Sequence, residues 1–326
     1  MTLPAAAVAF LAAALATVPL QAKTQAPMRM AEAAPKPAPA AHGARQPDLA
    51  FGAFQRGYFL TAFAEAMKAV DKGDMHAMTL LGELYSNGLG IPQDDSKAAK
   101  WYKLAADRGD RDAMFALAIF NVTRRGGLHD RNEAAKLFAA AAKLGHSAAA
   151  YDLGLLYLEG QQFPQDFRHA AELFKLASQE GNSEAQYALA TLYRDGKGVP
   201  QDLKESTRLL GTAALADNVD AEVEYAIALF NGNGIDKDPA RAALLFRRAA
   251  LRGSPIAQNR LARLLMVGEG APANPVEAIK WHLIAKAGGN GDPLLDQFAA
   301  KQTRQVQDAA AKAAAPWLAV LHVPKT

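Results

Sequence analysis

Cysteine is absent from the chain. Its absence excludes disulfide bonds, zinc sites built on thiolates, a thiol nucleophile and a lipid anchor on an N-terminal cysteine. A strong excess of one charge is missing as well, because 36 lysine and arginine residues stand against 33 aspartate and glutamate residues, which leaves a net charge of +3. A chain so nearly neutral offers no strong field to nucleic acid, and we expect no nucleic-acid partner.

Motifs of catalysis and of metal or cofactor binding are also missing. The sequence has no G-x-S-x-G motif, and no two of its histidines have the i, i+4 spacing of a helical metal site. Glycine pairs such as Gly88-x-Gly90 follow no predicted strand and carry no Walker lysine, so they predict loops rather than phosphate sites. His282 occupies an aromatic slot of a helix and is predicted to pack. We therefore expect no catalytic, metal-binding or cofactor-binding residue and no enzyme activity.

What the sequence does contain is a fixed period of 36 residues. Alanine recurs at this spacing from Ala77 through Ala113 to Ala257, and leucine recurs from Leu81, with Tyr225 as its one replacement. A fixed period in this range predicts a solenoid of stacked repeats. Six repeats result, with these bounds: 75–110, 111–146, 147–182, 183–218, 219–254 and 255–290.

Each repeat is predicted to form two helices joined by a tight loop. In the first repeat Ala77 and Leu81 lie on one face of the first helix, and Ala98 and Trp101 on one face of the second. Short helices must pack on one another to be stable, so we expect Trp101 to be buried and its replacement by alanine to cost about 3–5 kcal/mol. The loop ends in a side chain that caps the second helix. The predicted caps are Asp94, Asp130, Asp166, Asp202, Asp238 and Asn274.

This pattern resembles the Sel-one-like repeat (SLR) family, a relative of the tetratricopeptide repeat. The first repeat matches the family pattern at Ala77, Leu81, Gly82, Tyr85, Gly88, Gly90, Asp94, Lys97, Ala98, Trp101, Tyr102, Ala105, Ala106 and Gly109. The resemblance implies an all-α, right-handed α-solenoid that binds proteins. The sequence departs from the pattern where Asn121 replaces the tyrosine, Arg124 the first loop glycine and Asp217 the terminal glycine.

The segments outside the repeats differ in composition. Residues 1–22 contain the uncharged run Leu3–Leu20, which predicts a secretory signal peptide and a periplasmic protein with no stable membrane insertion after cleavage; an uncleaved membrane anchor is the alternative. Residues 23–50 are rich in proline and alanine and predict a disordered spacer. Residues 51–74 predict an N-terminal capping helix similar to the second helix of an incomplete repeat, and residues 291–326 a C-terminal capping helix with a tail.

Charge is sorted along one face of the first helices, the face that lines a concave groove in related solenoids. It holds carboxylates in repeats three to five and arginines in repeat six: Asp152, Glu159, Glu184, Asp195, Asp220, Glu224, Arg260 and Arg263. Neighbouring slots are apolar: Phe115, Ile119, Val122, Tyr151, Leu155, Leu158, Ile227 and Phe230. We hypothesise that this face binds a protein segment of complementary charge and that its carboxylates are exposed. The alternatives are a solvated charged face and apolar packing between repeats.

The layout of signal peptide, spacer and six repeats is similar to that of periplasmic SLR regulators. Those proteins restrain a sensor kinase and so control exopolysaccharide and envelope genes. The likeness implies a non-enzymatic interaction protein whose partner is a membrane sensor or other envelope machinery. Two alternatives stay open. One is a structural scaffold in polysaccharide export or cell-wall assembly, and the other is a hydrolase of β-lactam-like substrates, as claimed for cysteine-rich members whose disulfides this chain cannot form.

Overall fold

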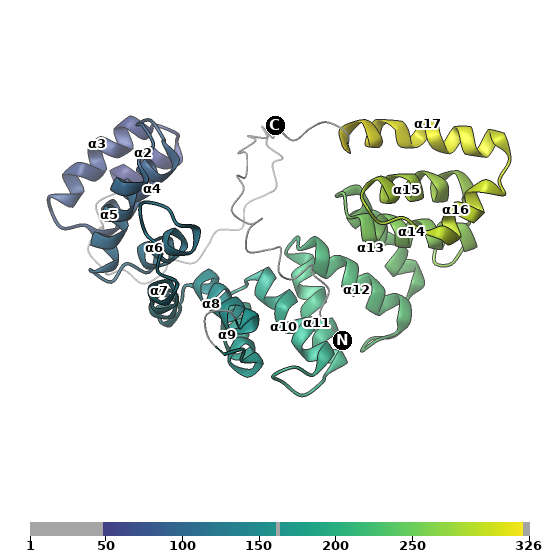
Figure 1. Cartoon of the computed structure of the whole chain (residues 1–326), viewed down its shortest axis with the longest axis horizontal. Helices are drawn as coiled ribbons and strands as arrows, with labels where there is room; N and C mark the ends of the chain where they lie inside the picture. Colours follow the sequence, from purple (N-terminus) through teal and green to yellow (C-terminus); the bar gives the residue numbers. More distant parts are fainter. Residues whose placement is uncertain (1–47, 161–163, 322–326) are drawn as a thin grey trace, which may run out of the picture.

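The computed structural model describes residues 48–160 and 164–321, and these residues form helices and no strand. The all-α solenoid predicted from the period is confirmed. Successive helices follow one another along an arc from α2 to α17 (Figure 1). The predicted signal peptide and nearly all of the predicted spacer lie outside the described residues. Within the described ranges, no helix combines the length and apolar character needed to cross a membrane.

Each repeat contributes a first and a second helix. The first helices are α4 (Met75–Asn87), α6 (Arg111–Thr123), α8 (Ser147–Glu159), α10 (Ser183–Asp195), α12 (Val219–Asn231) and α14 (Pro255–Val267). The second helices are α5 (Asp95–Ala106), α7 (Arg131–Lys143), α9 (Phe167–Gln179), α11 (Leu203–Leu215), α13 (Pro239–Leu251) and α15 (Pro275–Ala287). Every helix of the array packs on the next one along the chain, so the core is continuous from repeat to repeat.

The predicted caps are all confirmed. Asp94 Oδ1 accepts a hydrogen bond of 3.0 Å from the backbone N–H of Lys97, and the equivalent side chains of the other repeats cap their second helices in the same way. These bonds satisfy N–H groups that have no partner inside the helix, which fixes where each second helix begins.

The second repeat keeps this loop despite its departures from the family pattern. Arg124 adopts the left-handed conformation, with φ of 61°, that glycine adopts in the other described repeats. In the first repeat the N–H of Asp94 donates to the Tyr85 carbonyl, whereas in the second the N–H of Asp130 donates to the side-chain oxygen of Asn121 at 3.0 Å. Asn121 therefore supplies the acceptor that holds the loop closed.

The second glycine of the loop brings successive repeats into close contact. A Cβ placed on Gly198 would overlap the carbonyl oxygen of Phe167 at the start of the preceding second helix. Gly126, Gly234 and Gly270 meet the equivalent carbonyls of the repeats before them in the same way. These glycines are thus required by the approach of two backbones, in addition to the turn predicted from the sequence.

Both ends of the array carry two helices where the sequence predicts one. At the N-terminal end these are α2 (Leu49–Gln55) and α3 (Phe59–Val70). Phe59 and Val70 lie one period before the ends of α5, so α3 takes the place of a second helix. At the C-terminal end are α16 (Pro293–Ala300) and the longer α17 (Arg304–Leu321), which packs along α15.

Two tryptophans in the same slot of the second helix differ in burial. Trp281 is 1% exposed and meets Trp317 of α17 edge to face, with ring centroids 5.4 Å apart. Trp101 is only partly buried, between the cores of the first two repeats and of the N-terminal helices. Trp101 is therefore less buried than expected, and the large cavity expected from its removal belongs to Trp281.

Candidate interaction groove

A groove of about 670 Å³ crosses the first helices of repeats one to four. Helices α6 and α8 supply most of its wall. In Figure 1 they lie on the inner side of the arc, and α7 and α9 lie on its outer side. The side chains that define the groove are Phe115, Ile119 and Val122 of α6, Tyr151, Asp152 and Leu155 of α8, and Glu184 of α10. We call this surface the repeat groove. Five of the eight apolar side chains singled out in the sequence line it, and the other three pack against the cores.

The apolar wall of the repeat groove is held in place from behind. Phe115 packs on Phe138 with ring centroids 5.8 Å apart and stacks on His146 at 4.3 Å, while Tyr151 packs on Phe174 at 5.6 Å. Phe138 and Phe174 are almost fully buried. Phe115 and Tyr151, which are partly buried, thus rest on a buried core. The apolar side chains therefore both pack between repeats and line a groove.

Asp152 is one of the two carboxylates that line the groove, and Glu184 is the other. Asp152 is partly buried, and burial raises the pKa of its carboxyl to about 7. Within the described residues, no lysine or arginine forms an ion pair with it. Burial also raises the pKa of Glu184 at one end of the groove, although a hydrogen bond from Asn218 opposes this effect. Such groups are costly to ionise without a cation beside them.

The other predicted carboxylates do not join the groove. Burial raises the pKa of Glu159 and of Asp220, and neither lines the groove. Asp195 and Glu224 are bound by Arg194, at 3.0 and 3.2 Å. The expected exposure is confirmed for Glu184 and Asp195 and is wrong for the other four carboxylates, which are partly buried because the first helices of adjacent repeats cover one another's side chains. Arg194, the residue before Asp195 on α10, also breaks the sorting of charge along this face.

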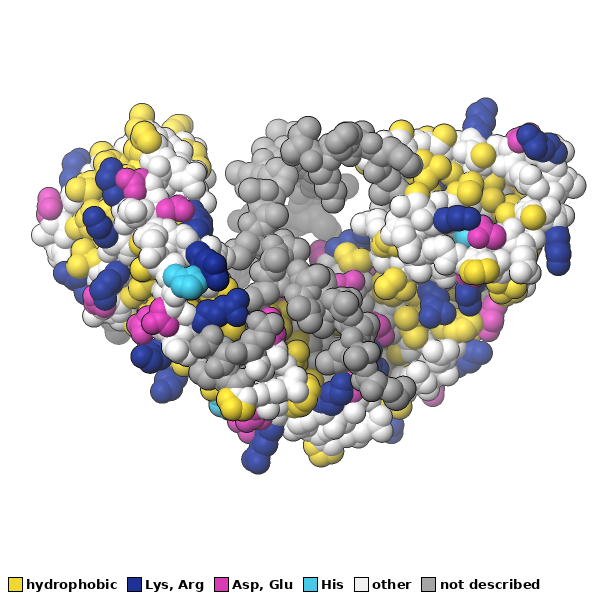
Figure 2. All heavy atoms as spheres, viewed as in Figure 1, with side chains coloured by type: hydrophobic (Ala, Val, Ile, Leu, Met, Phe, Trp, Pro, Cys, Tyr) yellow, Lys and Arg dark blue, Asp and Glu magenta, His cyan; other side chains and the backbone are white. Residues whose placement is uncertain are grey.

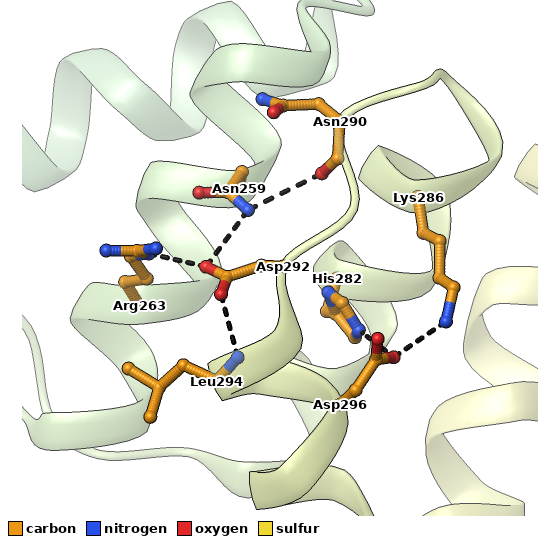
Figure 3. Close-up of polar contacts among 8 residues, drawn as sticks. All are labelled: Asn259, Arg263, His282, Lys286, Asn290, Asp292, Leu294 and Asp296. Atoms are coloured by element: carbon orange, nitrogen blue, oxygen red, sulfur yellow. Dashed lines mark hydrogen bonds and ion pairs between the residues drawn. The ribbon is translucent and has the colours of Figure 1, made fainter.

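The two arginines predicted for the sixth repeat lie far from the repeat groove in sequence, and neither lines it. Arg260 is exposed. Arg263 binds Asp292, which is 3% exposed and also accepts hydrogen bonds from Asn259 and from the N–H of Leu294 (Figure 3). Burial raises the pKa of Asp292, but its hydrogen bonds outweigh this effect and hold the pKa below its usual range. Arg263 therefore fastens α16 to α14.

A neighbouring cluster fastens α16 to α15. Asp296 Oδ1 lies 2.8 Å from His282 Nε2 and 2.8 Å from Lys286 Nζ (Figure 3). His282 is 1% exposed, which agrees with the packing role predicted for it. Within the described ranges, no group of three histidine, aspartate or glutamate side chains is arranged to hold a metal ion. Charges of both signs are intermixed over the face shown in Figure 2.

These features define an α-solenoid of two-helix repeats, and comparison with known proteins agrees. The chain belongs to the Sel1 repeat family, whose model matches residues 76–110, 111–146, 147–182, 183–218, 219–254 and 255–290. Proteins of this family are generally interaction scaffolds without catalytic function. A search of curated proteins gave no match.

Two solved structures show the same fold. One is a protective antigen present in uropathogenic Escherichia coli strains and displaying an SLR fold: identity is 26%, the TM-score is 0.72, and the match covers 82% of this chain and 62% of the antigen. This chain thus matches less than two thirds of the antigen's length. The other is a Sel1 repeat protein from Oxalobacter formigenes, at 24% identity and a TM-score of 0.65, with 74% of this chain and 97% of that chain covered.

Proposed function

We propose that the protein is a non-enzymatic scaffold that binds a segment of a partner protein in the repeat groove. The observation that carries the proposal is the carboxylate of Asp152, which lies among apolar side chains of the groove and forms no ion pair within the described residues. Arg125 also lines the groove but binds Asp95. A lysine or arginine of the bound segment would supply a cation for Asp152, and apolar side chains beside it would cover Phe115 and Tyr151. The occupant is therefore a basic, amphipathic segment.

The charge of Asp152 makes this binding dependent on pH. A cationic segment prefers the ionised carboxylate, whose pKa is raised to about 7, so affinity should rise as the pH increases through that value. We expect a short fluorescent peptide in which lysine and leucine alternate to bind about tenfold more tightly at pH 8 than at pH 6, because lysine stays charged throughout. Fluorescence anisotropy of the full chain measures this.

The control variants separate Asp152 from the other groups that titrate nearby. Asp152→Asn should weaken binding at pH 8 and remove most of the pH dependence of the affinity. Any pH dependence that His146 or Glu184 contributes should remain. Matched neutralisations of exposed carboxylates on the second helices, Glu133→Gln and Glu172→Gln, should leave affinity unchanged. The role of the groove would be refuted if the second-helix variants lost as much affinity as Asp152→Asn, or if Asp152→Asn kept the pH profile of the unchanged protein.

The proposal extends to export and regulation. We place the protein in the periplasm, where it would restrain an envelope sensor or control exopolysaccharide production. The support is the uncharged run Leu3–Leu20 ahead of a segment rich in proline and alanine. N-terminal sequencing of the protein from fractionated cells should find a chain that begins near residue 23. An intact Met1 on a cytoplasmic protein would contradict export and leave the groove proposal standing.

A further inference from the structure

A second cleft, of about 610 Å³, lies over the second helices α11 and α13 of repeats four and five. It shares no lining residue with the repeat groove. Its floor includes Gly211, Tyr225 and Leu245, and its rim carries four cationic side chains, which are Lys204, Arg208, Arg241 and Arg248. No carboxylate lines the cleft within the described residues. We call it the basic cleft.

Two residues open this cleft. Gly211 occupies a variable slot that holds a side chain in every other repeat, and Tyr225 occupies the slot that holds leucine in the other five. A Cβ placed on Gly211 would lie 3.4 Å from the Tyr225 ring, so the missing side chain leaves that ring open to the cleft. Glycine inside a helix costs about 1 kcal/mol relative to alanine. The fourth repeat therefore keeps an unfavourable residue at the point where the cleft opens.

The rim cations are not equally engaged within the protein. Arg208 is bound by Glu205 at 2.7 Å, and Arg248 by the fully buried Glu222. Arg241 lies over the Tyr225 ring, 5.6 Å from its centroid, and Lys204 is exposed. Within the described residues, neither Lys204 nor Arg241 forms an ion pair with a carboxylate. The cleft thus presents two unpaired cations across an apolar floor.

Exposed leucines extend the apolar surface beside this floor. Leu215 at the edge of the cleft is 83% exposed, and Leu244 on α13 is 68% exposed. Leu244 occupies a slot where lysine stands in the first, second and sixth repeats. Large apolar side chains beside cations mark surfaces that bind amphipathic anions.

We propose that the basic cleft binds an acidic, amphipathic segment of a partner protein. An apolar side chain of that segment lies over Gly211 and Tyr225, and its carboxylates pair with Lys204 and Arg241. The recessed floor favours a peptide over an anionic membrane, because a lipid surface reaches protruding leucines and not the bottom of a cleft. The site is separate from the repeat groove and takes a ligand of opposite charge, so one chain can join two partners.

A short fluorescent peptide in which glutamate and leucine alternate tests the proposal on the full chain. We expect saturable binding that weakens with salt. The double variant Lys204→Gln with Arg241→Gln should lower the affinity about tenfold or more, because it removes both unpaired cations. Gly211→Gln should lower it similarly by filling the floor, and since it replaces a helical glycine it should not lower the melting temperature.

The matched control changes the same helical slots elsewhere. Arg168 on α9 and Lys97 on α5 are the counterparts of Lys204 and Arg241, and Arg168→Gln with Lys97→Gln should leave the affinity unchanged. Asp152→Asn should also leave it unchanged, so this proposal and the groove proposal fail separately. Each of three results would overturn it: no saturable binding of the acidic peptide, equal loss in the matched control, or binding of phosphatidylglycerol vesicles in place of the peptide.

Discussion

Gly198→Ala should destabilise the junction between the third and fourth repeats by about 2–4 kcal/mol. The added Cβ would overlap the carbonyl oxygen of Phe167, a backbone atom that cannot move without shifting α9, and Gly198 has a φ of 71° that alanine adopts with strain. Because each repeat is stabilised by its neighbours, a weakened junction should also split urea denaturation, followed by circular dichroism, into two transitions.

Gly181 provides the matched control. It too has a positive φ, of 83°, but a Cβ placed on it would meet nothing within 4 Å. Gly181→Ala should therefore cost only about 1–2 kcal/mol, the price of the left-handed conformation, and leave a single transition. Equal losses in the two variants would show that backbone strain alone, and not the contact between repeats, explains the glycine at position 198.

Trp281→Ala should cost about 3–5 kcal/mol, since a large and fully buried ring leaves a cavity that the helices around it cannot fill. Trp281 packs on Trp317, so the loss should also loosen α17 from α15. Urea denaturation gives the free energy, and amide hydrogen exchange in residues 304–321 reports the loosening.

Trp101→Ala is the control for this prediction, because Trp101 occupies the same slot and is only partly buried. We expect it to cost about 1–2 kcal/mol, less than a buried aromatic residue and more than a surface change. A loss at position 101 as large as the loss at position 281 would mean that burial does not govern the cost in this slot.

The sequence was sufficient to predict the helices because their signals are local. The apolar slots and caps such as Asp94 depend on residues a few positions apart, and the 36-residue period repeats these local signals six times. The two helices at each end were missed because these segments carry only one copy of any pattern, so no repetition marks the break near Tyr58 or at residues 301–303.

The candidate site was harder to predict because its charges are set by contacts between repeats. The position of a residue within its repeat gives the direction of its side chain on its own helix. It does not give the side chain of the next repeat that lies against it. Arg194 meets Glu224 and Arg263 meets Asp292, each about one repeat away in sequence. Burial of Asp152 likewise depends on the stacking of neighbouring helices. The basic cleft was also missed, although Tyr225, which breaks the leucine pattern, and Gly211, a glycine inside a helix, could have marked it.

The contact between each loop glycine and the preceding second helix has a consequence for how such chains change length. At Gly126, Gly198, Gly234 and Gly270 the contact joins a glycine to a backbone carbonyl, so it carries no side-chain identity. At this contact any unit that keeps the glycine can follow any other, whereas ion pairs such as that of Arg194 with Glu224 depend on the side chains of both units. Duplication or deletion of a whole unit would then lengthen or shorten the array by a fixed step.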